Sequence, residues 1–187
     1  MCTMTRDVKL TYDDLLRLPD DDLRHELIGG VHYVTASPTL RHQRVLGRLY
    51  LAIGNWLDDH SVGEVYFAPV DVVLSPFDVV VPDLLFMSHA RASTVSAPEA
   101  VRGMPELLIE VLSPSTRRRD QSLKRALYER EGVAEYWVVD PLRDTIRVYR
   151  RQEAGRLVAR NLSAASGDVL CTPLLSGLTI ALPDIFR

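Results

Sequence analysis

Two stretches of the chain place a carboxylate inside an apolar run. Residues 79–86 contain Asp83, and residues 107–112 contain Glu110. Continuous apolar runs are typical of strands buried on both faces. There an ionised carboxylate costs several kcal/mol unless a cation or hydrogen-bond donors compensate. Because the chain does this twice and supplies Lys124 soon afterwards, the pattern predicts a cation site and favours a metal-dependent enzyme over an inert domain.

The two acids are expected near the ends of neighbouring central strands. From there the oxygens of Asp83 and Glu110 could hold a hard cation. Mg²⁺ suits this arrangement, because it takes one or two protein carboxylates and fills its other positions with water or phosphate oxygens. The alternative is that each acid pairs with an arginine or accepts from a backbone amide at a strand end, and the residues alone leave both interpretations open.

Lys124 lies on the helix expected directly after the second apolar run. Asp120, Lys124 and Tyr128 recur at intervals of four, so they form one stripe of that helix. Lys124 borders the apolar stripe of Leu123 and Leu127, from where its ammonium could reach back toward the carboxylates. The alternative is an Asp120–Lys124 surface pair, which would contribute a few tenths of a kcal/mol.

Other polar residues are predicted to support such a site. His42, at the start of a long helix, could orient a neighbour or move a proton, since histidine titrates near neutral pH; a polar first-turn residue is the alternative. Asp71 lies in another apolar stretch, either supporting the site from behind or bonding across a strand pair. Arg117 and Arg118 belong to a basic run that could contact a nucleic-acid backbone or could simply be solvated.

The elements that must position these residues follow from hydrophobic periodicity and turn signals. We expect helices over residues 11–18, 38–63 and 120–131, with Thr11 and Ser37 as N-caps and with Gly63 and Gly132 at the ends of the last two. We expect strands over residues 25–28, 31–34, 65–74, 79–87, 106–112, 136–140, 145–149 and 157–162, and a loop over residues 88–103 that could contain one short helix. This order predicts an α/β (α+β) fold with a mixed sheet flanked by helices.

Length and composition narrow the class of protein. A chain of 187 residues, 47% hydrophobic and 25% charged, fits a single domain over residues 1–187, with residues 1–10 as a flexible N-terminus. The net charge of −3 argues against a polybasic nucleic-acid coat but not against a local basic channel. With only two cysteines, no disulfide framework is expected, which favours a cytoplasmic setting. No signal peptide or membrane span, and hence no membrane partner, is predicted.

Five ordered segments carry a resemblance to a known family. They are Arg24-His25-Glu26-Leu27-Ile28, residues 68–74, Val81-Pro82-Asp83-Leu84, residues 109–116 and residues 135–141. From about Tyr12 to Phe186 the chain resembles the Uma-two family of the restriction-endonuclease-like, or PD-(D/E)XK, nuclease superfamily. The resemblance implies a mixed sheet between helices, β-hairpin additions near both ends, a metal-dependent phosphodiesterase-type site and a homodimer.

The superfamily motif maps onto this chain residue by residue. Pro82-Asp83 matches the PD element and Glu110 the second acid, whereas the lysine expected two residues later is Leu112. Lys124 resembles the migrated lysine that many members use instead. Glu26 matches an N-terminal acid near the metal, and His42 a histidine typical of the family.

The leading hypothesis is therefore an endonuclease that depends on Mg²⁺, with Mn²⁺ as a substitute, and hydrolyses nucleic acid, DNA being expected. Asp83, Glu110 and Lys124 would be catalytic, and Asp83, Glu110 and Glu26 would bind the metal. The predicted supporting or substrate-positioning residues are His42, Asp71, Arg117, Arg118 and Tyr128. One alternative is a catalytically silent nuclease fold that acts as a nucleic-acid-binding or scaffold module. A paired-carboxylate hydrolase of sugars ranks last, because both tryptophans sit in apolar patterns.

Overall fold

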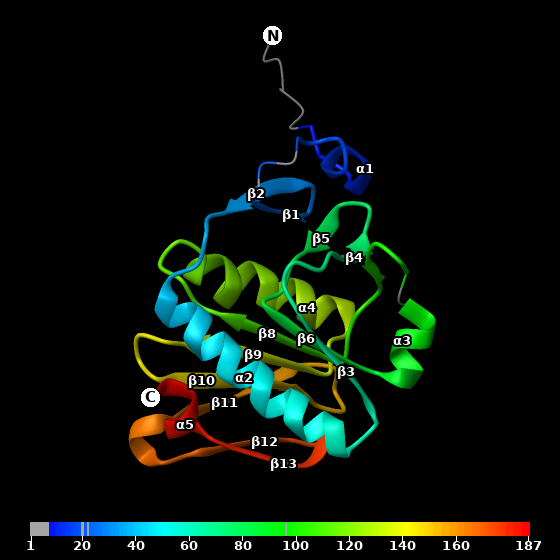
Figure 1. The fold of residues 1–187 in the computed structure, drawn as a ribbon. Coiled ribbons are helices and arrows are strands. Elements are labelled where there is room, and N and C mark those ends of the chain that lie inside the picture. Colours follow the sequence, from blue (N-terminus) through cyan, green and yellow to red (C-terminus); the bar gives the residue numbers. More distant parts are fainter. Residues whose placement is uncertain (1–7, 20, 22, 96) are drawn as a thin grey trace.

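A computed structural model describes residues 8–19, 21, 23–95 and 97–187. The first seven residues of the predicted flexible N-terminus lie outside this part. A six-stranded sheet in the order β11-β10-β9-β8-β6-β3 forms the centre of the molecule (Figure 1). Its strands are β3 (Gly63–Phe67), β6 (Leu84–Ser88), β8 (Leu107–Val111), β9 (Glu135–Asp140), β10 (Thr145–Arg151) and β11 (Leu157–Ser163). Strands β8 and β9 are parallel and the other pairs antiparallel, so the predicted mixed sheet is confirmed.

Helices cover both faces of this sheet. Helix α2 (Leu40–Asp59) lies on one face, and the π-helical turn η1 (Arg119–Lys124) with α4 (Arg125–Glu131) lies on the other (Figure 1). Successive β8 side chains point to opposite faces, so Ile109 packs in the core under α2 while Leu108 packs in the core under α4. Burial on both faces explains why the β8 sequence is apolar at almost every position.

A second, five-stranded sheet stands at one end of the central sheet, in the order β2-β1-β5-β4-β7 (Figure 1). Its strands are β1 (Arg24–Ile28), β2 (Val31–Thr35), β4 (Val72–Ser75), β5 (Asp78–Val80) and β7 (Val101–Arg102). The short helix α1 (Tyr12–Leu15) packs Tyr12 and Leu15 against Leu27 and Val79 of this sheet. Thr11 is its N-cap, as predicted, and forms a capping box with Asp14.

The remaining helices and strands lie around these two sheets. They are α3 (His89–Val95), the 3₁₀ turn η2 (Ala164–Ser166), the hairpin β12 (Val169–Thr172) and β13 (Leu175–Ala181), and α5 (Leu182–Phe186). Leu170, Ile180 and Phe186 extend the core that α2 covers. No helix in the described part of the chain has the length and apolarity needed to cross a membrane.

The long helix starts and stops at other residues than predicted. Thr39, not Ser37, is the N-cap of α2, because its hydroxyl accepts from the His42 N–H at 3.2 Å. The helix ends at Asp59, and Gly63 begins β3 instead of closing the helix. Gly63 is required there, since a Cβ would lie 2.2 Å from the Met87 carbonyl oxygen across the β3–β6 pair.

The prediction of one long strand over residues 65–74 and another over residues 79–87 was wrong, because each stretch forms two strands that belong to different sheets. The first stretch contains β3 and β4, and the second contains β5 and β6. Pro69 and Pro82 lie in the gaps, where a residue without a backbone N–H interrupts strand pairing. Asp83 therefore lies at the crossing between the two sheets, not within a strand. The predicted loop over residues 88–103 contains α3 and β7.

Candidate active site

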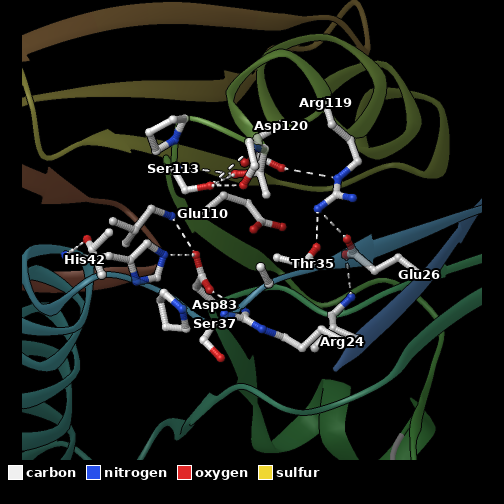
Figure 2. A pocket seen from close by; sticks show the side chains of 18 of the residues that line it. Arg24, Glu26, Thr35, Ser37, His42, Asp83, Glu110, Ser113, Arg119 and Asp120 are labelled. Atoms are coloured by element: carbon white, nitrogen blue, oxygen red, sulfur yellow. Dashed lines mark hydrogen bonds and ion pairs between the residues drawn. The ribbon is translucent and has the colours of Figure 1, made fainter. Parts of the chain in front are cut away.

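A cavity of about 270 Å³ opens where the two sheets meet. Residues from β1, β2, the 36–39 connection, the 81–83 crossing, β8, the 113–116 loop and η1 contribute to its wall. The charged side chains that line it are Arg24, Glu26, Asp83, Glu110, Arg119, Asp120 and Lys124, and His42 joins them. All four carboxylates are buried, and Figure 2 shows them around one shared space. Asp83 and Glu110, separated by 27 positions in the sequence, thus face the same cavity.

Asp83 is held by three donors. Arg24 Nη1 donates to Oδ1 at 2.7 Å, the Val111 N–H donates to Oδ2 at 2.9 Å, and His42 Nε2 lies 3.1 Å from Oδ2. Burial alone would raise the pKa of Asp83, but the hydrogen bonds and charges of His42 and Arg24 outweigh it and lower the pKa to about 2. Asp83 is therefore ionised at neutral pH although it is buried.

His42 is oriented by this carboxylate. Because an ionised Asp83 can only accept, the proton of the shared hydrogen bond resides on His42 Nε2. The other ring nitrogen, Nδ1, is buried and has no hydrogen-bond partner among the described residues. The sequence left His42 as either a site residue or a polar first-turn residue, and the structure places its side chain against Asp83 in the cavity wall.

Glu110 reaches the cavity from the middle of the central sheet. Its Oε1 accepts from Lys124 Nζ at 2.7 Å and from the Tyr128 hydroxyl at 3.0 Å. Burial raises the pKa of Glu110 well above its usual range, Lys124 opposes the rise, and Asp120, Asp83 and Glu26 add to it. Burial and the Glu110 charge also raise the pKa of the Tyr128 hydroxyl, so Tyr128 is a neutral donor here.

Lys124 is 2% exposed and bridges two acids. Its Nζ lies 2.6 Å from Glu26 Oε1 and 2.7 Å from Glu110 Oε1. Burial alone would lower its pKa, but the charges of Glu110, Glu26 and Asp120 raise it, so the ammonium stays protonated. Asp120 Oδ1 lies 3.8 Å away; the Asp120–Lys124 pair exists, but inside the cavity wall and not on the surface.

Glu26 links the second sheet to the helical wall. Its Oε1 also accepts from the Val81 N–H at 2.9 Å, and its Oε2 lies 3.0 Å from Arg119 Nη2. Arg119 Nη2 donates in addition to the Thr35 hydroxyl at 2.5 Å. The Arg119 guanidinium lies over the Tyr33 ring, 5.4 Å from its centroid. Three parts of the chain, β1, the 81–83 crossing and η1, therefore meet at the Glu26 carboxylate.

Three predicted supporting residues lie elsewhere. Asp71 accepts from the Tyr12 hydroxyl at 3.1 Å and lines a different cavity, and burial raises its pKa. Arg117 pairs with both oxygens of Asp140 at 2.7 and 3.0 Å, and Arg118 is exposed. Of the basic run, only Arg119 lines the site.

Sequence reasoning did not assign Arg24 or Asp120 to the site, and it included Arg119 only as one member of the basic run that flanks the site. Arg24 stands next to the predicted hairpin, but nothing in the sequence connects it to Asp83, which is 59 positions away. Arg119 is one of three consecutive arginines, and only the orientation of the helical turn distinguishes it from the other two. Asp120 did carry a signal, because it shares the Lys124 stripe.

The donor set fits a hard divalent cation. Glu26, Asp83, Glu110 and Asp120 supply carboxylate oxygens, the ligands that Mg²⁺ prefers. Asp120 Oδ1 is buried without a hydrogen-bond partner among the described residues. Burial and the neighbouring acids raise the pKa values of Glu110 and Asp120. A bound cation would lower both pKa values again. In the same part of the chain no three acidic, histidine or cysteine side chains form a ready-made metal cluster, so Arg24 and Lys124 would have to share their acids with the ion.

The fold and the carboxylate–lysine cavity define a protein of the restriction-endonuclease-like class. A family model, Uma2, described as "Putative restriction endonuclease", matches residues 12–183, and the chain therefore belongs to the Uma2 family. A crystal structure from Anabaena variabilis, described as that of a "putative nuclease", superposes with a TM-score of 0.79 at 19% identity. The match covers 95% of this chain and 97% of that chain, which shows a shared fold. No curated protein matches the sequence.

Proposed function

We propose that this protein is a Mg²⁺-dependent endonuclease that hydrolyses phosphodiester bonds of nucleic acid, with DNA as the expected substrate. One observation carries the proposal: four buried carboxylates surround a single cavity, with a buried lysine bonded to two of them. Asp83, Glu110 and Glu26 would hold the ion, or Mn²⁺ in its place, and Asp120 offers an oxygen that has no hydrogen-bond partner among the described residues. A bound ion of this kind lowers the pKa of a ligated water and polarises a phosphoryl oxygen.

The protein's own cations have separate tasks in this proposal. Lys124 is fixed between Glu26 and Glu110, so its ammonium is oriented before substrate arrives and offsets charge that develops on the phosphoryl group. Arg24 and Arg119 line the same cavity and position a phosphate. His42 keeps Asp83 in one orientation through the Nε2–H bond.

A second candidate function is a nuclease fold that binds nucleic acid without cutting it. Two observations favour it: Leu112 stands where the motif has a lysine, and both oxygens of Asp83 already accept from protein donors. Titration calorimetry with Mg²⁺ and Mn²⁺ separates the two functions. Ion binding by the wild type that is lost in Asp83→Ala supports the nuclease, and wild type that binds no ion supports the alternative.

The direct test compares nucleic-acid cleavage by the wild type, Asp83→Ala, Glu110→Gln and Lys124→Ala with Mg²⁺ or Mn²⁺. We expect loss of cleavage in all three variants. Glu106→Gln is the matched control, because this acid flanks the same strand but bonds to Ser88 outside the cavity, and it should cut normally. Removing Lys124 takes away the buried ammonium that bonds to both Glu26 and Glu110, which destabilises by about 3–5 kcal/mol. Each variant must therefore be shown by thermal melting to be folded at the assay temperature. Cleavage retained in all three folded variants would contradict the proposal.

The predicted homodimer remains a proposal about assembly. Its support is the family resemblance alone, and no feature of the cavity requires a second copy. Sedimentation equilibrium over a range of concentrations measures it directly, and a monomer at every concentration would contradict it.

A further inference from the structure

A second hollow adjoins the active-site cavity. It has a volume of about 520 Å³, within the roughly 300–1,000 Å³ of sites that take small organic groups. We call it the Phe67 groove; its lining residues are Leu23, Arg24, Pro38, Gln43, Leu46, Phe67, Ala68 and Pro69. Arg24 and Pro38 also line the active-site cavity, so the two hollows share a wall.

The Phe67 backbone lies beside the Asp83 backbone, yet the Phe67 ring faces water. Phe67 ends β3 opposite Leu84, and the next residue, Ala68, donates its N–H to the Asp83 carbonyl oxygen at 3.1 Å. The side chain is nevertheless 58% exposed. Its aromatic contact is one T-shaped pairing with Tyr50, at 5.1 Å between ring centroids. The backbone is therefore fixed by the β3–β6 pair while much of the ring is left available to a ligand.

The chemistry of the groove matches a nucleobase. A base offers a flat π face and a polar edge, and aromatic side chains take such faces by stacking. Gln43 contributes an amide that can donate and accept at a base edge. No lining residue is acidic, and Arg24, whose Nη1 holds Asp83, stands between the groove and the cavity. The groove is thus suited in shape and charge to the base next to a phosphate in the cavity.

We propose that the Phe67 groove binds an unpaired base of the strand that is cut, and that the substrate is single-stranded or locally unpaired nucleic acid. The inference rests on the proposed nuclease function, because it places the phosphate in the active-site cavity. A base in an intact duplex is stacked and paired, so it cannot offer its face to Phe67 without leaving the helix.

The test measures binding separately from cleavage. A short single-stranded deoxyoligonucleotide with one internal 2-aminopurine is titrated with protein in EDTA, and anisotropy and base fluorescence are recorded. Stacking is worth about 1–3 kcal/mol per base by alanine substitution, so Phe67→Ala should weaken single-strand binding by roughly 5- to 150-fold and remove the fluorescence change. Phe67→Trp should retain both. Phe77→Ala is the matched control, since Phe77 is also an exposed aromatic but lies in the β4–β5 turn, and it should bind as the wild type does.

Three results would overturn the inference. The first is equal single-strand affinity of Phe67→Ala and Phe77→Ala, both shown by melting to be folded. The second is an equal loss of affinity of Phe67→Ala for a blunt duplex of the same sequence. The third is a wild-type dimer that Phe67→Ala converts to monomer, which would make the groove a contact between copies. If the wild type cuts and any of these results is found, the base site fails while the nuclease stands. If single-strand binding depends on Phe67 but no ion supports cleavage, the nuclease fails instead.

Discussion

The Asp83 carboxylate keeps its negative charge inside the protein because donors from three distant parts of the chain surround it. From the sequence, either a metal ion or an arginine was an acceptable partner for this acid. The structure places Arg24 on Oδ1 and His42 with the Val111 N–H on Oδ2. An acid inside an apolar run indicates that it has a partner. The local sequence does not identify that partner, because the partner comes from a distant part of the chain.

This environment makes Asp83 a source of pH-dependent stability. Its pKa is lowered from 3.8 to about 2, so its contribution to folding is present above the unfolded pKa and is lost as the pH falls toward 2. The shift corresponds to about 2 kcal/mol. We expect Asp83→Asn to lower the free energy of unfolding by about that amount at neutral pH, and the difference from the wild type to narrow below pH 4. Urea denaturation at a series of pH values measures both quantities.

The control for this experiment is Asp71→Asn. Burial raises the pKa of Asp71, so its contribution changes with the opposite sign: stability is lost as the pH rises through the raised pKa. Asp71→Asn should therefore raise the free energy of unfolding at higher pH and leave it unchanged at acidic pH. A difference between wild type and Asp83→Asn that stays constant from neutral pH to pH 2 would contradict our account of Asp83.

At the scale of elements, the hydrophobic pattern located most helices and strands but not the changes of path that build the site. The Glu110 strand, the two hairpins and a helix ended by Gly132 were all predicted and are confirmed. The split of the 79–87 run was missed, because β5 and β6 are equally buried although they belong to different sheets. Periodicity reports burial, and it cannot report which sheet a strand joins.

The π-helical turn η1 is a second feature that the pattern could not show. Leu123, expected on the apolar stripe, is 43% exposed, whereas Asp120 and Lys124 are buried. The turn is supported by tertiary contacts: the Tyr136 hydroxyl donates to the Asp120 carbonyl oxygen at 3.0 Å, and Lys124 bonds to Glu26 and Glu110. Such turns occur frequently at functional sites. Here the turn places an arginine, an acid and a lysine in one cavity wall.

Shortening this turn should separate those three residues. Deleting Ser122, which is exposed, would let the segment form a regular α-helix, in which Arg119 and Asp120 rotate by about 100° relative to Lys124. We expect cleavage to fall to the background of Lys124→Ala while the circular-dichroism spectrum stays close to that of the wild type. Ser122→Ala is the control and should cut normally. Full activity in the deletion variant would show that the π-helical geometry is not needed.

At the scale of the whole molecule, the cavity lies where two sheets and a helix meet, so it exists only in the complete fold. Glu26 comes from the second sheet, Glu110 from the central sheet and Lys124 from the helical layer, and direct ion pairs join them. The family resemblance predicted that these three residues belong to the site. The sequence alone indicated Asp83, Glu110 and Lys124, because these charged residues lie within or beside apolar stretches. The counter-ions Arg24 and Arg119 depended on the folded arrangement.

Because all three layers contribute carboxylates to one cavity, a bound divalent ion should stabilise the whole protein. An ion at a hundred times its Kd adds about 2.7 kcal/mol to the free energy of unfolding. For a chain of 187 residues, this raises the melting temperature by roughly 5–11 °C. We expect this shift with Mg²⁺ or Mn²⁺ in a single calorimetric transition, since the sequence predicts one domain, and not with K⁺ at equal ionic strength.

Glu110→Gln should remove this stabilisation. The substitution relieves the burial cost that raises the pKa of Glu110 but also removes a charge bonded to the buried Lys124 ammonium, so the ion-free melting temperature of the variant serves as its own baseline. Mg²⁺ should no longer shift that temperature. Glu106→Gln should retain the full shift, because its carboxylate lies outside the cavity. Equal shifts in the wild type and Glu110→Gln would place the ion elsewhere, and the acids of this cavity would then be explained by their protein cations alone.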